Sequence, residues 1–120
     1  MGLDTSHGCW HGGYSAFSRW RTQIAAQIGI TLDCMEGFGG GRPWPSSEQE
    51  PLVHLLNHSD CDGELEHQHC AAIADRLTEI LPGLPADDED GHIGNWRDKT
   101  QLFIDGLRLA AKCGENVLFR

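Results

Sequence analysis

The stretch NWRDKTQLFIDGLRLAAKCG, residues 95–114, carries the longest helix signal in the chain. Its large apolar side chains recur at the spacing of an α-helix, which places them on one face toward a core. The residues of this face are Trp96, Phe103, Leu107 and Ala110. Gly114 follows as a residue suited to the left-handed conformation that ends many helices. We therefore predict that the longest helix of the fold spans this stretch.

Two further segments with helical periodicity supply partners for this long helix. Residues 15–28 begin at Ser15, a suitable N-cap. Their apolar face consists of Phe17, Trp20, Ile24 and Ile28. The segment that ends at Pro82 has a second such face, made by Cys70, Ile73, Ala74, Leu77, Ile80 and Leu81. A short helix or turn is predicted for residues 51–57, because Pro51 suits a first helical position.

Two short segments have features of β-strands. In residues 30–35, apolar and polar side chains alternate, as they do along a strand with one buried face. Residues 116–120 are the expected partner strand. The predicted fold class is mainly α: a compact three-helix domain with a short two-stranded β ribbon made by these two segments. The length of 120 residues fits a single domain, residues 1–120.

The composition limits the classes of function. The formal net charge is −9 at pH 7, which opposes non-specific binding to nucleic acid and to anionic membranes. No segment is apolar enough to span a bilayer, and the N-terminus lacks the apolar region of a secretory signal. The five cysteines have irregular spacing and form no CxxC pair. We expect a cytoplasmic protein with reduced thiols, no nucleic-acid partner and no membrane partner.

The densest group of chemically active side chains is HSDCDGELEHQHC, residues 58–70. As a calcium loop it fails, because His58 and His69 stand at the two anchor positions, where acidic residues normally bind the ion. His, Asp and Cys are ligands that zinc accepts, and a zinc ion needs about four of them. The candidate metal ligands are His58, Asp60, Asp62, His7 and His11.

The same stretch also has a structural interpretation. Asp60 or Asp62 can cap the following helix, and the acidic side chains after Gly63 suit the positive end of the helix dipole. Nevertheless, His58 beside two acids and a turn glycine is more than a helix cap requires. The metal site, with zinc as its ion, and the helix cap both stay open as interpretations of this stretch.

A second polar cluster, DGHIGNWRDK at residues 90–99, leads into the longest helix. Backbone N–H groups at a helix start, together with a nearby Arg, can hold a phosphate or a carboxylate. In the glycine-rich loop of residues 36–47, an Arg and a Trp can close over a flat ligand by ion pairing and stacking. The candidate ligand-binding residues are His92, Asn95, Trp96, Arg97, Arg42 and Trp44. The alternatives are a core position for Trp96, an ordinary N-cap at Asn95 and a plain surface loop.

Three segments of the chain are distinctive: LDTSHGCWHGGYSAFSRWR at residues 3–21, LLNHSDCDGEL at 55–65 and GHIGNWRDKTQLFIDGL at 91–107. The chain resembles a family of short proteins from bacteriophage and actinobacterial genomes, over most of its length and most specifically in these segments. That family has no established function, so the resemblance transfers no catalytic residue. It implies a compact cytosolic domain whose site combines the N-terminal segment, the HSDCDGE turn and the GHIGNWR helix start.

Binding is favoured over catalysis, because neither GxSxG nor a known cysteine signature is present. We expect a small phage-type protein that sequesters an anionic, nucleotide-derived signal in a polar His/Asp/Arg site, in the manner of counter-defence sponge proteins. Such a protein would form homo-oligomers and would need no catalytic residue. One alternative is a metal-dependent, zinc-type hydrolase centred on the HSDCDGE turn. A second alternative is an acidic adaptor that binds a basic protein partner.

Overall fold

The structure is a computed structural model that describes residues 2–36, 39–46, 48–57, 63–84 and 96–119. In chain order the helices are α1 (Tyr14–Gln27), α2 (Val53–Leu56), α3 (His67–Ile80) and α4 (Trp96–Cys113). The strands are β1 (Gly2–Asp4), β2 (His11–Gly13), β3 (Glu64–Leu65) and β4 (Val117–Leu118). Single 3₁₀ turns are η1 (Ser6–Gly8), η2 (Leu32–Cys34) and η3 (Leu81–Gly83).

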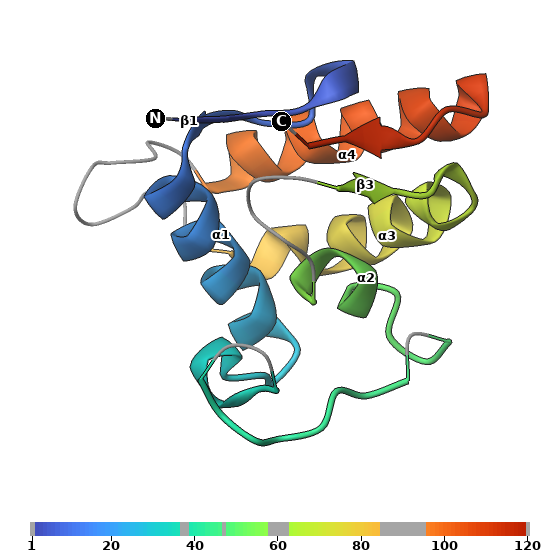
Figure 1. Cartoon of the computed structure of the whole chain (residues 1–120). Coiled ribbons are helices and arrows are strands. Elements are labelled where there is room, and N and C mark those ends of the chain that lie inside the picture. The colour runs from blue at the N-terminus through green and yellow to red at the C-terminus, as the bar shows by residue number, and fades with distance from the viewer. Residues whose placement is uncertain (1, 37–38, 47, 58–62, 85–95, 120) are drawn as a thin grey trace.

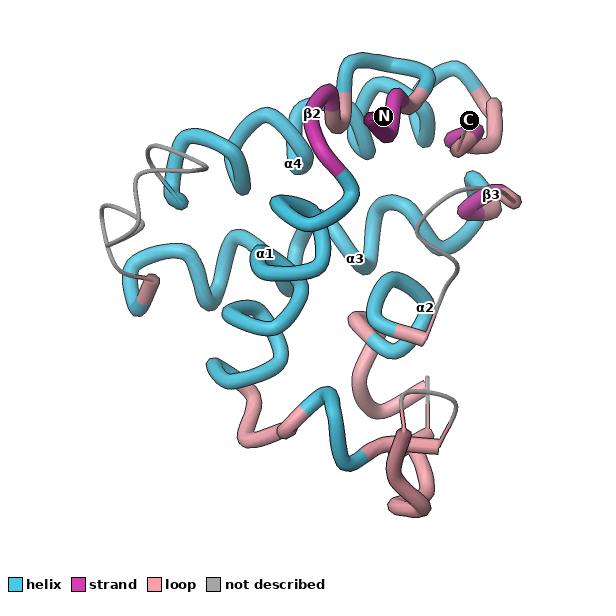
Figure 2. Tube along the Cα trace, turned by 60° about the vertical axis from the view of Figure 1, so that its left-hand side comes forward, coloured by secondary structure: helices cyan, strands magenta, loops and turns pink. Residues whose placement is uncertain are grey.

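The helices α1, α3 and α4 form the body of the fold (Figure 1). α3 and α4 lie side by side and run in opposite directions, while α1 crosses them near the end where α4 begins. Both chain ends lie on the same side of the fold, next to α4 (Figure 2), and Thr5 forms an antiparallel bridge with Phe119. The prediction of a mainly helical fold with three long helices and a short two-stranded ribbon is confirmed.

The face of α4 that was predicted from the sequence is the buried face. Its buried side chains include Trp96, Phe103, Leu107 and Ala110. Trp20 of α1 packs on Phe103 with ring centroids 4.7 Å apart, and its Nε1 donates a hydrogen bond to Thr100 Oγ1 at 2.9 Å. The core therefore satisfies the polar edge of this indole while it buries the apolar rings.

The α3 prediction is confirmed in the same way. The buried residues of this helix are Cys70, Ile73, Ala74, Leu77 and Ile80. The chain leaves the α-helix at Ile80, and Pro82 lies in the 3₁₀ turn η3 that follows. Proline cannot continue a helix because it lacks an N–H group, so the end of α3 is encoded locally.

The bounds of the other helices differ from the prediction by one or two residues. α1 spans Tyr14–Gln27, against a predicted 15–28, and Gly13 rather than Ser15 is its N-cap. Gly114 has φ of 67° directly after α4, as expected for a glycine that ends a helix.

Within the described residues, no helix combines the length and the hydrophobicity needed to cross a membrane.

The predicted pairing of residues 30–35 with residues 116–120 is wrong. Leu32–Cys34 form a 3₁₀ turn whose backbone groups are hydrogen-bonded locally. Groups that close a local turn are not free to form a ladder with a distant strand. The C-terminal segment pairs instead with β3, where Leu65 lies opposite Val117. The ribbon exists, but its other strand comes from the chain directly after the HSDCD segment.

A second ribbon, which the sequence did not indicate, is formed by β1 and β2, with Leu3 opposite Gly12. The turn η1 lies between these strands and packs against α4. Gly106 of α4 permits this approach, because a Cβ atom there would lie 2.5 Å from Cys9 Sγ and 2.8 Å from the carbonyl oxygen of His7. The missing side chain on α4 thus determines where the N-terminal turn sits.

Candidate functional site

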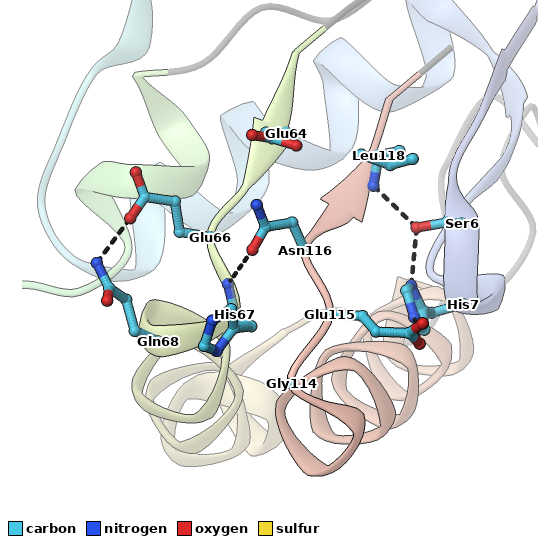
Figure 3. A pocket seen from close by; sticks show the side chains of 10 residues that line it. All are labelled: Ser6, His7, Glu64, Glu66, His67, Gln68, Gly114, Glu115, Asn116 and Leu118. Carbon is cyan, nitrogen blue, oxygen red and sulfur yellow. Dashed lines mark hydrogen bonds and ion pairs between the residues drawn. The ribbon is translucent and has the colours of Figure 1, made fainter.

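A cleft of about 660 Å³ opens between turn η1, the start of α3 and the segment that follows α4 (Figure 3). Ser6 and His7 lie on one side of it, and Glu64 and Glu66 lie on the other. The segment 114–118 runs between the two sides. The cleft therefore combines residues from the beginning, the middle and the end of the chain.

A continuous set of hydrogen bonds occupies the η1 side of the cleft. The backbone N–H of Leu118 donates to Ser6 Oγ at 2.8 Å. Ser6 Oγ lies 2.7 Å from Nδ1 of His7, and Nε2 of the same ring lies 3.0 Å from Oε1 of Glu115. The side chain of His7 is only 13% exposed, whereas that of Glu115 is 62% exposed, so the bond between them lies at the solvent-facing edge of the cleft.

The backbone of His7 has an unusual conformation. Its φ is 62° and its ψ is 12°, and it is the one non-glycine residue with positive φ among the described residues. Side chains other than glycine enter this region at a cost, although His does so more readily than most. Such residues concentrate at functional sites, where the surrounding structure holds the strained backbone in place.

Carboxylates dominate the rest of the cleft. Glu64, Glu66 and Glu115 line it, and their side chains are exposed. The side chain of Gln68 donates to Glu66 Oε2 at 2.6 Å, and Asn116 Oδ1 accepts from the backbone N–H of His67 at 2.9 Å. The described residues that line the cleft include neither Lys nor Arg.

A second, smaller cleft of about 370 Å³ lies between α2 and the start of α3. The imidazoles of His54 and His69 stack there, with ring centroids 3.9 Å apart and an angle of 17° between the rings. Burial lowers the pKa of His54 below 6.5, the nearby His69 lowers it further, and Glu66 opposes the shift. The neutral form of His54 is therefore favoured, because burial and the stacked neighbour both act against its charged form.

Five of the predicted site residues lie outside the described residues: His58, Asp60, Asp62, His92 and Asn95. Of the remaining metal candidates, His7 lines the larger cleft. His11 lies on β2 with 89% of its side chain exposed, and its Nδ1 is 3.5 Å from Oδ1 of Asp4. No three His, Cys, Asp or Glu side chains in the described part of the chain are grouped so that they could hold a metal ion. Zinc binding by the HSDCDGE turn stays a prediction.

The predicted anion site divides into separate places. Trp96 is buried in the core, and Arg97 donates hydrogen bonds to the carbonyl oxygens of Leu84 at 3.0 Å and Pro82 at 3.4 Å. Trp44 donates through Nε1 to the carbonyl oxygen of Glu36 at 3.0 Å.

Arg42 lies in the same loop as Trp44, and its backbone N–H donates to the carbonyl oxygen of Cys34 in turn η2 at 3.0 Å. This loop, residues 39–46, lies at the C-terminal end of α1, whereas α4 begins near the opposite end of α1 (Figures 1 and 2). The structure thus does not bring Arg42 and Trp44 together with Trp96 and Arg97.

Sequence reasoning missed Ser6 and Glu115. A local signal did exist for Ser6, since serine and glycine are both common in tight turns. For Glu115, which follows the glycine that ends α4, the sequence offers no sign of a partner 108 residues away.

Comparisons of this chain with known proteins leave the resemblance to phage and actinobacterial proteins as a prediction. No protein-family model, no curated protein and no solved structure gives a significant match to the chain.

Proposed function

We propose that this is a small ligand-binding protein whose cleft between η1 and α3 takes an organic cation, such as a guanidinium or an alkylammonium group. The observation that carries the proposal is the charge of the cleft. Glu64, Glu66 and Glu115 line it, and the described lining residues include no Lys or Arg. A cationic group is the ligand chemistry that such a surface attracts.

The expected affinity follows from the exposure of these groups. The net charge of −9 adds to the negative potential of the cleft. Because all three carboxylates are exposed, each ion pair with a ligand contributes about 0.2–1 kcal/mol. For a simple cation the sum predicts a dissociation constant in about the millimolar range or weaker. Binding should weaken further with added salt, which screens exposed charges.

The sequence-based expectation of an anionic, nucleotide-derived ligand stays a separate prediction. It depends on His92 and Asn95, outside the described residues, and on Arg42 and Arg97, which bond to different parts of the chain. The carboxylates of the cleft would repel a phosphate group. The zinc-type hydrolase, the acidic adaptor and the homo-oligomer likewise stay predictions.

Isothermal titration calorimetry at low ionic strength tests the proposal, with agmatine as the cationic probe and ADP-ribose as the anionic one. We expect heat of binding with agmatine that disappears at high salt. The double variant Glu64→Gln/Glu66→Gln should weaken this binding at least several-fold, because it removes two of the charges while it keeps the shape of the side chains.

The matched control is Glu79→Gln/Asp105→Asn, which makes the same change in net charge outside the cleft. Glu79 is paired with Arg76 on α3, and Asp105 is exposed on α4. Equal weakening by both double variants would mean that the overall charge, and not the cleft, binds agmatine. Flat titrations with agmatine, or binding of ADP-ribose alone, would also contradict the proposal.

A further inference from the structure

We propose that Ser6, His7 and Glu115 form a nucleophile, a general base and an orienting carboxylate that hydrolyse activated carboxylic esters at the edge of the cleft. The assignment of the nucleophile stands on the hydrogen bonds of these side chains. The preference for esters that carry a positive charge rests on the proposed function of the same cleft.

The direction of the hydrogen bonds is determined by the groups at the two ends. The backbone N–H of Leu118 can only donate, and the carboxylate of Glu115 can only accept. Nε2 of His7 must therefore carry a proton that it donates to Glu115. In the neutral imidazole this leaves Nδ1 as an acceptor, so Ser6 donates its hydroxyl proton to Nδ1.

This direction is the one that general-base catalysis requires. Ser6 Oγ lies 2.7 Å from Nδ1, within the range in which a base can take a proton. Compared with the usual serine triad, the two ring nitrogens exchange roles, since here Nδ1 faces the serine and Nε2 faces the carboxylate. Either nitrogen can act as the base once a hydrogen bond at the other one sets the tautomer.

Two further contacts favour the ionised forms that arise in the reaction. The N–H of Leu118 points at Ser6 Oγ and stabilises negative charge that develops on this oxygen. The carboxylate of Glu115, 3.0 Å from Nε2, stabilises the imidazolium that forms when Nδ1 takes the proton. Ser6 and His7 both line the cleft, so a substrate that enters it can reach the hydroxyl.

The backbone around this site packs closely on α4. His7 keeps a positive φ of 62°, and its carbonyl oxygen lies against α4 at Gly106. A strained residue needs surrounding contacts that fix it, and close packing on a long helix supplies them. The conformation places both side chains of the turn in one hydrogen-bonded set, which an extended backbone would separate to opposite sides.

The reaction needs only the ester and water. Ser6 Oγ forms a bond to the acyl carbon while His7 Nδ1 takes the hydroxyl proton. The bond from the acyl carbon to the alkoxy group breaks, and the alcohol leaves with that proton. A water molecule then attacks the acyl-serine, gives its proton to His7, and releases the carboxylic acid as Ser6 recovers its hydrogen.

A neutral fluorophosphonate tests the nucleophile, because serine displaces fluoride from phosphorus with the help of the same base. We expect one adduct by intact-mass spectrometry, located on Ser6 by peptide mapping and absent in Ser6→Ala. The control Ser18→Ala, at an exposed position on α1, should label like the wild type. A wild-type protein without an adduct on Ser6 overturns the proposal.

The roles of the other two residues have separate readouts. His7→Asn keeps a residue that tolerates positive φ but removes the base, so labelling should slow about a hundredfold or more. Glu115→Gln should slow labelling, because an amide can also donate a hydrogen bond and no longer fixes the tautomer of His7, whereas Glu115→Asp should restore part of the rate. If Ser6 is labelled as fast in His7→Asn as in the wild type, His7 is not its base, and the mechanism is overturned.

A comparison of a charged and a neutral ester tests the cation site separately from the nucleophile. We expect faster hydrolysis of 4-nitrophenyl 6-aminohexanoate than of 4-nitrophenyl hexanoate, and loss of this difference in Glu64→Gln/Glu66→Gln. Labelling of Ser6 by the neutral fluorophosphonate should persist in the same variant. Labelling without preference for the charged ester would keep the nucleophile and reject the cation site.

Discussion

Nε2 of His7 lies 3.0 Å from Oε1 of Glu115, although the two residues are separated by 108 positions in the chain. Glu115 follows the end of α4, and the turn that carries His7 packs on the same helix at Gly106. The contact therefore joins the two ends of the chain at one wall of the cleft. Changes in the packing of α4 should consequently reach the cleft as well as the core.

The first prediction concerns this packing, and Gly106→Ala is expected to destabilise the fold. Replacing a glycine within a helix by alanine normally stabilises a protein by about 0.5–1 kcal/mol. Here the new Cβ would lie 2.8 Å from the carbonyl oxygen of His7 and 3.0 Å from Cys9 Cα, which are backbone atoms. Overpacking of this kind costs about 1–3 kcal/mol, so urea unfolding should show a net loss of stability.

Gly41→Ala is the matched control, because a Cβ atom at Gly41 would have no neighbour within 4 Å. Its free energy of unfolding should stay within about 0.5 kcal/mol of the wild type. A more stable Gly106→Ala would show that the N-terminal turn moves aside at little cost.

Thr100→Val is predicted to destabilise the core without creating a large cavity. Thr100 is fully buried and accepts the hydrogen bond from Nε1 of Trp20 at 2.9 Å. Valine has nearly the same shape but leaves the indole N–H without its acceptor, which costs about 1–3 kcal/mol. Urea unfolding, monitored by circular dichroism, measures the loss in the free energy of unfolding. Thr100→Ser keeps the hydroxyl group and should remain closer to the wild type than the valine variant.

The stacked pair of His54 and His69 predicts a loss of stability in acid. Burial and the neighbouring His69 lower the pKa of His54 in the folded protein, so the unfolded chain takes up this proton first as the pH falls. The contribution of neutral His54 is therefore complete above about pH 6.5 and declines as the pH falls from there toward the lower folded-state pKa.

The measurement is the free energy of unfolding at about pH 7.5 and about pH 5.5, on either side of the ordinary pKa of histidine. His54→Gln should reduce the difference between the two values. His11→Gln, at a position with 89% of its side chain exposed, should leave the difference as it is in the wild type. An equal pH dependence in all three proteins would contradict the role of His54.

The cysteines should differ in their reaction with alkylating reagents. Burial raises the pKa of the Cys9 thiol to about 12 and that of the Cys70 thiol to about 11. Cys34 and Cys113 are exposed. Because the thiolate is the reactive form, iodoacetamide at mildly alkaline pH should modify Cys34 and Cys113 well before the buried pair. Peptide mapping after short exposure measures the order, and early modification of Cys9 would contradict its burial.

The long helices, whose signal is local, were predicted correctly. The periodic apolar faces located α1, α3 and α4, and Pro82 and Gly114 marked the ends of the last two. These signals need only neighbours within a few turns of the same helix. The strand prediction for residues 30–35 failed because alternation over so few positions also fits a 3₁₀ turn with one buried residue, Leu32.

The candidate site was predicted less completely than the helices. His7 was selected from the sequence as a candidate metal ligand, which stays a prediction, and its hydrogen bonds with Ser6 and Glu115 were not expected. Trp96, a candidate ligand contact, lies in the core, which was the alternative position expected for it. A single sequence shows which side chains are chemically capable, whereas their partners depend on how distant segments pack.

The sequence by itself determined the helices, their buried faces and the acidic charge, because each depends on residue type and spacing along a short stretch. Only the tertiary structure decided that β3 pairs with β4, that turn η1 rests on Gly106, and that His7 meets Glu115. Those contacts join segments far apart in the chain, and they depend on how α3 packs on α4 and on where that packing places the two ends of the chain.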